Sequence, residues 1–151
     1  MEEYLRGISA RFRTLSAKIK LISLLETAKN EYEKHNLKEG YDALIEAYEL
    51  DKKNPVTLRG LGCFKQSEGD FESAIDYYKK ALEFSETKEI EYTLIGAAFY
   101  LQDKLDDALI YFNKAIDEND NYDPAYEGRN QAMLENHLKL VDLQESLKKY
   151  F

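Results

Sequence analysis

The chain has 151 residues, of which 44% are hydrophobic and 33% charged, and its formal net charge at pH 7 is −8. This length and composition are those of one globular domain that buries a core, and two prolines and seven glycines leave no flexible linker. The acidic balance argues against nucleic acid as the main partner, because phosphate binding needs a basic stripe.

The first 20 residues contrast with the acidic remainder, since they hold five basic and two acidic side chains. Large apolar residues alternate there at spacings of three and four, which predicts a helix with a narrow apolar seam. The seam consists of Leu5, Ile8, Phe12, Leu15, Ile19 and Ile22. The simpler interpretation is a helix over residues 1–20 that caps the unit after it. The alternative is a dimerisation or membrane-surface helix.

Residues 55–122 carry one pattern twice, at a spacing of 34. The first copy has Leu58, Leu61, Gly62, Ala74, Tyr78 and Ala81, and the second has Tyr92, Ile95, Gly96, Ala108, Phe112 and Ala115. Large residues three apart form the apolar face of a first helix, and a short polar turn separates it from a second helix. Residues 21–54 fit the same register well only in their second half. We therefore expect helical hairpins at residues 21–54, 55–88 and 89–122.

Helix starts are marked by three predicted caps. Asn54 precedes Pro55 and Asp123 precedes Pro124, which is the expected order of an N-cap and a first helical residue. Asn36 and Glu39 have the spacing of a capping box.

The last segment predicts one long helix over residues 123–151. It contains no glycine or proline after Gly128, and Tyr126, Met133, Leu140 and Leu147 recur every seven residues. Polar residues between them would give a terminal cap the outer face that water tolerates.

This 34-residue pattern resembles the tetratricopeptide repeat, which has two antiparallel helices per unit. The resemblance implies a single all-α domain over residues 1–151, built as a right-handed superhelix of three hairpins. A helix would cap each end, over residues 1–20 and 123–151. One hairpin cannot bury its own apolar face, so the hairpins must stack.

The resemblance also implies a binding surface, because the first helices of such repeats line a concave groove that holds an extended peptide or a partner helix. The groove positions in this sequence are Ile22, Leu25, Lys29, Tyr32, Val56, Arg59, Cys63, Gln66, Ile90, Thr93, Ala97, Tyr100, Glu127 and Gln131. We expect apolar side chains there to supply affinity, and Lys29 and Arg59 to pair with a ligand carboxylate. The alternative is that these residues are helix contacts, with Tyr32 and Tyr100 covered by the terminal helices.

No catalytic or metal-binding motif is found. His35 and His137 are far apart in sequence, no Cys/His cluster occurs, and phosphate-loop, HExxH and GxSxG patterns are missing. The single cysteine, Cys63, excludes an internal disulfide and indicates a reducing compartment. No apolar run has the length of a signal peptide core or a membrane span. We expect a cytoplasmic protein without enzymatic activity, cofactor or metal.

Two known uses of the repeat were compared with the sequence. The two-carboxylate clamp for chaperone C-termini needs Lys, Asn, Asn, Lys and Arg, and the clamp is absent here. The matching positions carry Leu25, Lys29, Gly60, Ile90 and Leu94. Class II type III secretion chaperones have a similar size and helix order. Residues 60–75 resemble their second repeat, whereas the third repeat lacks their usual aromatic and cysteine pattern.

These observations predict a non-catalytic protein-interaction module, such as an adaptor, scaffold or chaperone, that binds a peptide or partner helix in the groove. One alternative is a self-associating structural or secretion-chaperone protein that forms a homodimer through residues 1–20. Another is a regulatory subunit that binds a folded enzyme through an apolar patch outside the groove.

Overall fold

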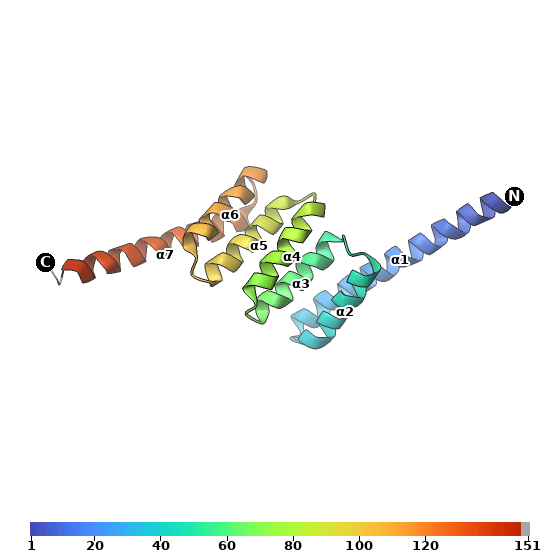
Figure 1. Ribbon diagram of the computed structural model, residues 1–151, viewed down its shortest axis with the longest axis horizontal. Coiled ribbons are helices and arrows are strands. Elements are labelled where there is room, and N and C mark those ends of the chain that lie inside the picture. Colours follow the sequence, from blue (N-terminus) through green and yellow to red (C-terminus); the bar gives the residue numbers. More distant parts are fainter. Residues whose placement is uncertain (149–151) are drawn as a thin grey trace.

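The computed structural model describes residues 1–148, and within them it contains seven helices and no strand. The helices are α1 (Glu2–Glu33), α2 (Leu37–Leu50), α3 (Pro55–Ser67), α4 (Phe71–Phe84), α5 (Lys88–Leu101), α6 (Leu105–Glu118) and α7 (Asp123–Lys148). They stack into an elongated array whose first and last helices project at opposite ends (Figure 1). The all-α architecture expected from the sequence is confirmed.

The repeated sequence pattern is the pattern of the core. Helices α3 and α4 fall within residues 55–88, and α5 and α6 fall within residues 89–122. The buried large residues of the pattern are Leu58, Leu61, Tyr78, Ile95 and Phe112, and its buried small residues are Ala74, Ala81, Ala108 and Ala115. Each large side chain contributes about 1.5–3 kcal/mol by leaving water. The small residues let the paired helices approach closely.

Glycine is required where the two helices of a hairpin cross. A Cβ atom at Gly62 would lie 2.4 Å from Cε1 of Tyr78, whose ring is fully buried. The contact recurs 34 residues later, where a Cβ at Gly96 would lie 2.9 Å from the ring of Phe112. The aromatic ring of each second helix therefore packs on the bare backbone of the first.

The hairpin turns also repeat. The residue with a left-handed backbone is His35 in the first turn (φ 62°), Gly69 in the second (φ 80°) and Asp103 in the third (φ 63°). These positions are 34 apart. Glycine adopts this conformation without steric cost, whereas the other two residues do so with some strain.

One of the three predicted caps is confirmed. Asp123 is wrong as a cap, because it is itself the first residue of α7. Oδ1 of Asn54 accepts a hydrogen bond from the backbone N–H of Thr57 at 3.0 Å. Asn36 makes no side-chain cap; its Nδ2 donates instead to Oε2 of Glu31, at 2.6 Å across the α1–α2 turn. A bond to a charged acceptor is stronger than a neutral cap. Hydrogen bonds from Asn36 and then Lys34 lower the pKa of Glu31.

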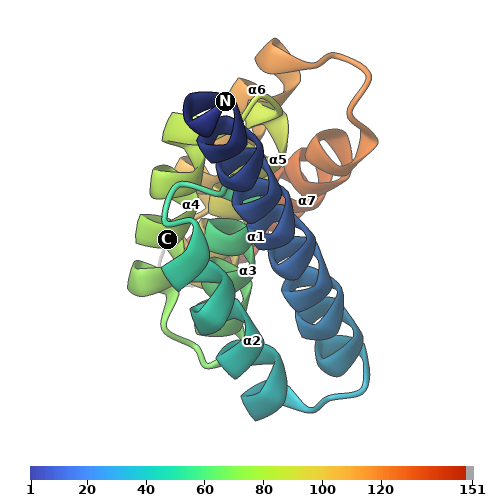
Figure 2. The same cartoon turned by 90° about the vertical axis from the view of Figure 1, so that its right-hand side faces the viewer.

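The boundary predicted at residue 20 is wrong, because α1 is one continuous helix from Glu2 to Glu33. No glycine or proline occurs between Gly7 and Gly40, so nothing ends the helix there. Residues 1–20 are exposed apart from half-buried Ile8. This half of α1 extends beyond α2 into solvent (Figure 1), while the other half lies alongside α2 (Figure 2). The segment is therefore an extension of the first unit and does not lie on that unit as a cap.

Helix α7 packs on the array only through its first half. Its buried residues are Ala125 and Ala132, and a Cβ at Gly128 would lie 2.4 Å from the ring of Phe112. Met133 and Leu140 are each 54% exposed. The side chain of Leu147 and residues 149–151 of the predicted C-terminal helix lie outside the described part of the chain.

The crossing glycines make a prediction about stability. Gly62→Ala is expected to destabilise the protein by about 1–3 kcal/mol, because the new methyl group would push the buried Tyr78 ring out of place. Urea unfolding followed by circular dichroism measures this change. Gly7→Ala is the matched control, since nothing lies within 4 Å of its Cβ and alanine favours a helix. Equal stability of the two variants would contradict the packing argument.

Candidate functional site

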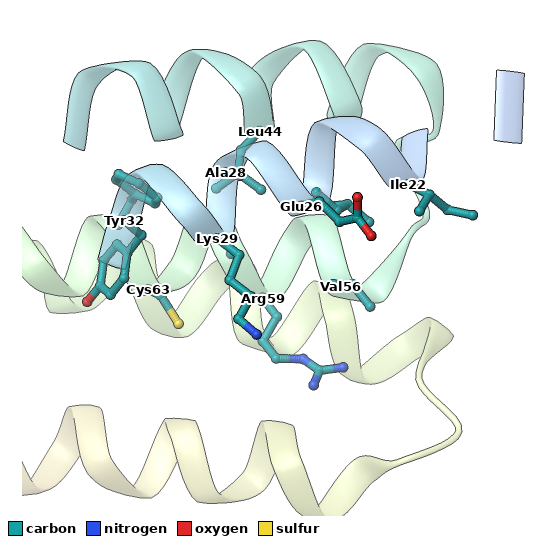
Figure 3. Close-up of a pocket in the computed structure, with 12 residues that line it drawn as sticks. Ile22, Glu26, Ala28, Lys29, Tyr32, Leu44, Val56, Arg59 and Cys63 are labelled. Atoms are coloured by element: carbon teal, nitrogen blue, oxygen red, sulfur yellow. The ribbon is translucent and has the colours of Figure 1, made fainter. Parts of the chain in front are cut away.

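A hollow with a volume of about 500 Å³ lies between α1 and α3 (Figure 3). Its lining is mostly apolar and comes from Ile22, Leu25, Glu26, Ala28, Lys29 and Tyr32 of α1, from Leu44 of α2, and from Val56, Arg59, Gly60, Cys63 and Phe64 of α3. Ala28, Leu44 and Phe64 are buried, so they form its floor. The walls carry the exposed side chains, among them Ile22 and Val56.

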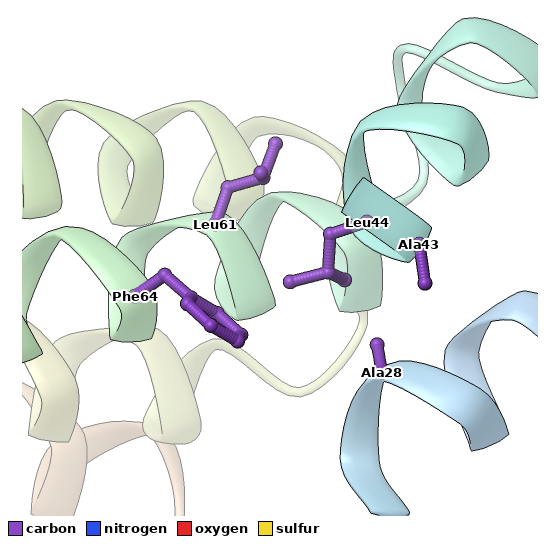
Figure 4. Close-up of a cluster of buried hydrophobic side chains, with 5 residues drawn as sticks. All are labelled: Ala28, Ala43, Leu44, Leu61 and Phe64. Carbon is purple, nitrogen blue, oxygen red and sulfur yellow. The ribbon is translucent and has the colours of Figure 1, made fainter. Parts of the chain in front are cut away.

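The floor residues belong to the apolar cluster that joins the first unit to the second (Figure 4). Its members are Ala28, Ala43, Leu44, Leu61 and Phe64. A Cβ at Gly60 would lie 2.8 Å from Cδ2 of Leu44, so this glycine lets α2 approach α3. Helix α1 packs chiefly on α2 and touches α3 only lightly. The facing sides of α1 and α3 therefore stay apart above the floor.

Seven of the predicted groove residues line this hollow. They are Ile22, Leu25, Lys29, Tyr32, Val56, Arg59 and Cys63. The sequence analysis did not single out Glu26 or the floor residues. Glu26 was detectable from its spacing, four residues after Ile22 on the same helix face. The floor residues were not, because their position depends on how two units meet.

The remaining predicted groove residues lie elsewhere. Oε1 of Gln66 accepts a hydrogen bond from the hydroxyl of Tyr78 at 3.2 Å, and Oγ1 of Thr93 donates to the carbonyl of Glu89 at 2.8 Å. Ile90 is half-buried, whereas Glu127 and Gln131 are exposed on α7. None of these residues lines the hollow.

Helix α7 partly covers two of the predicted groove residues of the third unit. Ala97 and Tyr100 pack against the cluster that includes Ala132 of α7. The carboxylate of Glu135 beside Tyr100 raises the pKa of that hydroxyl. The alternative interpretation, coverage by a terminal helix, therefore holds for Tyr100. It does not hold for Tyr32, which is 43% exposed and lines the hollow.

Arg59 already has a carboxylate partner inside the protein. Its Nε lies 3.0 Å from Oε1 of Glu91 on α5, and the Glu91 side chain is fully buried. Figure 3 shows the guanidinium group pointing away from α1. The expectation that Arg59 pairs with a ligand carboxylate therefore has to be corrected. Lys29 is the more available cation, because it is 75% exposed and 3.9 Å from Glu33.

Glu91 was missed by the sequence analysis although a signal for it exists. It occupies the register position that Thr57 and Ala125 fill in the neighbouring units, and all three side chains are fully buried. A carboxylate at a core position of a repeat needs a buried partner. Arg59 supplies that partner and links the second unit to the third.

Cys63 is part of the apolar wall. Burial raises the pKa of its thiol, so the side chain stays neutral. The hydroxyl of Tyr78 lies 3.5 Å from its Sγ, and burial likewise raises the pKa of Tyr78. The thiol is thus a weakly nucleophilic lining residue.

Neither a metal site nor a membrane span is found among residues 1–148. No three His, Cys, Asp or Glu side chains in this range are placed to hold a metal ion. Its helices include none that is both long and apolar enough to cross a bilayer.

The Arg59–Glu91 pair makes a second prediction about stability. Arg59→Met is expected to cost roughly 3 kcal/mol of unfolding free energy, because it leaves the Glu91 carboxylate buried without a countercharge. The double variant Arg59→Met/Glu91→Leu removes both charges and should recover much of the loss. Chemical denaturation of the single and double variants measures both effects. A double variant as unstable as Arg59→Met would show that the ion pair is not the cause.

No protein-family model matches the chain. It is similar to anaphase-promoting complex subunit 7 of Dictyostelium discoideum, with 33% identity over 104 residues, or 69% of this chain. The chain spans only 17% of the length of that relative.

Solved structures resemble the array closely. The first tetratricopeptide-repeat domain of Spaghetti (RPAP3), bound to the HSP90 peptide SRMEEVD, has a TM-score of 0.69 and 18% identity, covering 78% of this chain and 94% of that chain. The type III secretion chaperone SycD of Yersinia enterocolitica, in complex with a peptide of the translocator YopD, has a TM-score of 0.67 and 16% identity, covering 77% and 94%. The chain therefore has the tetratricopeptide-repeat fold that its 34-residue pattern predicted.

Proposed function

We propose that this chain is a non-catalytic protein-interaction module that binds a short apolar segment of a partner protein, in a reducing compartment such as the cytoplasm. The observation that carries the proposal is the hollow between α1 and α3, with Ile22 58% and Val56 48% exposed on opposite walls. Large apolar side chains held open to water around a concavity are typical of binding sites.

The structural neighbours support this proposal. Spaghetti and SycD share the fold, and each was solved with a peptide. Their peptides come from different proteins, so the fold itself does not select a ligand. The lining of this hollow therefore has to set its specificity.

The lining favours apolar side chains over a terminal carboxylate. The positions that would hold a two-carboxylate clamp carry Leu25, Lys29, Gly60, Ile90 and Leu94. Each apolar ligand side chain buried in the hollow contributes about 1.5–3 kcal/mol before the cost of association. A few such contacts correspond to a weak, reversible complex, with Lys29 available for a ligand carboxylate at the rim.

A pocket variant tests the proposal. The probe is a peptide of about 12 residues selected from a random phage library on the full chain, with its affinity measured by fluorescence polarisation. Val56→Glu is expected to weaken binding about tenfold or more, because it places a charge on an apolar wall. Ile110→Glu is the matched control, since Ile110 lies on α6 and is 53% exposed.

Alkylation of Cys63 localises the bound peptide in the same experiment. This cysteine is the only one in the chain and lines the hollow, so bound peptide should slow its reaction with iodoacetamide. A peptide that binds both variants equally and leaves the alkylation rate unchanged occupies another surface, which would refute the proposal.

The absence of the two-carboxylate clamp leads to a separate prediction about ligand binding. The peptide SRMEEVD is expected to show no saturable binding, because the hollow offers Leu25 and Gly60 where a clamp needs polar side chains. Isothermal titration calorimetry against the full chain measures this. The first domain of Spaghetti, whose structure contains that peptide, is the positive control. Binding of SRMEEVD with an affinity comparable to that of the Spaghetti domain would show that this surface binds terminal carboxylates.

A further inference from the structure

An apolar stripe runs along α1 into the hollow. It begins in the half of α1 that extends beyond α2, residues 2–20, which we call the free half. Its exposed large side chains are Leu5 (56%), Phe12 (68%), Leu15 (54%), Ile19 (60%) and Ile22 (58%). Ile22 is both the last member of this stripe and a wall of the hollow. From Leu5 to Tyr32 the two features together extend for about 40 Å along one helix, at about 1.5 Å per residue. This surface is mostly apolar, with Glu26 and Lys29 as the charged side chains that α1 contributes to the hollow.

The free half of α1 is unusual for a helix without neighbours. Isolated helical segments are marginally stable in water, and exposed apolar stripes are typical of surfaces that bind a partner. Lys20 forms an ion pair with Glu46 of α2 at 2.6 Å. Within residues 1–148, the stripe residues Leu5, Phe12, Leu15 and Ile19 are left exposed.

The charged residues beside the stripe indicate which kind of partner it would bind. Arg11, Lys18 and Lys29 lie at separations of 7 and 11 residues, so they line the same edge of the stripe. Arg11 and Lys18 make no ion pair within the described residues, whereas Arg6 pairs with Glu2 at 3.3 Å. Lys29 lies 3.9 Å from Glu33, and its side chain is 75% exposed. The stripe thus has a basic edge that the carboxylates of a partner can reach.

The negative charge of the rest of the molecule also favours binding of an acidic partner on the free half of α1. Residues 21–151 hold 16 basic and 27 acidic side chains, so an acidic partner is repelled by most of the surface and attracted to the free half of α1. Two copies of that half, each with five basic and two acidic residues, would repel one another in a symmetric pair.

We propose that the partner segment is an amphipathic helix with acidic flanks, which lies along α1 with one end in the hollow and the remainder on the free half. Its apolar face covers the stripe, and its carboxylates meet Arg11, Lys18 and Lys29. This inference rests on the proposed binding role of the hollow and adds the chemical class and the path of the partner. The free half of α1 is then the second half of the binding site.

The probes are two synthetic peptides of about 28 residues, long enough to span the stripe at about 1.5 Å per residue. Both carry leucine at heptad positions a and d, and the flanking positions are glutamate in one peptide and lysine in the other. Fluorescence anisotropy against the full chain is expected to show binding of the acidic peptide alone. Raising NaCl from about 50 mM to about 500 mM should weaken that binding, because the contacts are solvent-exposed. Equal binding of both peptides would overturn the proposal.

Charge-reversal variants separate this inference from the proposed function. Arg11→Glu/Lys18→Glu is expected to weaken the acidic peptide about tenfold while leaving the short selected peptide unaffected. Lys79→Glu/Lys88→Glu changes the net charge equally on exposed residues of α4 and α5, and should have little effect. If Val56→Glu weakens both peptides but Arg11→Glu/Lys18→Glu weakens neither, the hollow stands and the extended path is wrong. If Val56→Glu weakens neither, both proposals fail.

Two other occupants of the stripe are tested on the full chain alone. Sedimentation equilibrium is expected to show a monomer. A dimer that Phe12→Glu dissociates would make a second copy the occupant and overturn the inference. Co-sedimentation with phosphatidylserine vesicles, lost in Arg11→Glu/Lys18→Glu, would overturn it in favour of a membrane surface.

Discussion

The array depends on one contact that recurs with the 34-residue period, the packing of a side chain of the second helix on a small residue of the first. Tyr78 packs on Gly62, and Phe112 packs on Gly96. In the first unit the same register positions hold Leu44 and Ala28, both buried. Leu44 is smaller than the aromatic residues at its position in the other units, and Ala28 is larger than the glycines, so the two differences compensate. Because each crossing fixes how closely two helices approach, it also sets the distance to the next hairpin.

The concave side is open between α1 and α3 and closed between the later helices, and particular side chains explain the difference. Between α3 and α5 the buried Glu91 draws Arg59 across, and between α5 and α7 the cluster with Ala132 covers Ala97 and Tyr100. Between α1 and α3 the rings of Tyr32 and Phe64 meet at 5.4 Å between centroids, and the space above Leu44 lies open. The Leu44 side chain is also shorter than the aromatic rings at its register position in the other units. The hollow therefore lies where the repeat is least regular, and this irregularity leaves it open.

Within residues 1–148, the two ends of the array leave helix surface without a neighbour. Helix α1 continues past α2 because no helix breaker separates the seam from the first unit, and α7 continues past the third unit for the same reason. The exposed stripe on α1 is flanked by basic side chains and joins the hollow at Ile22. A partner that uses both surfaces gains apolar burial in one and charge selection from the other. In the proposed complex, the basic edge of α1 would add charge selection to the selection made by the lining of the hollow.

The resemblance to the tetratricopeptide repeat pointed to seven of the residues that line the hollow. The sequence by itself determined the repeat length, the core residues of the repeated pattern and the cap at Asn54. These features depend on short-range periodicity, which places side chains on one face of a helix whatever lies beyond it. Only the tertiary structure decided that Arg59 binds Glu91, that α7 covers Tyr100, and that residues 1–20 continue α1 into solvent. These outcomes depend on which helix lies opposite a given face. Spacing along one helix carries no information about that neighbour.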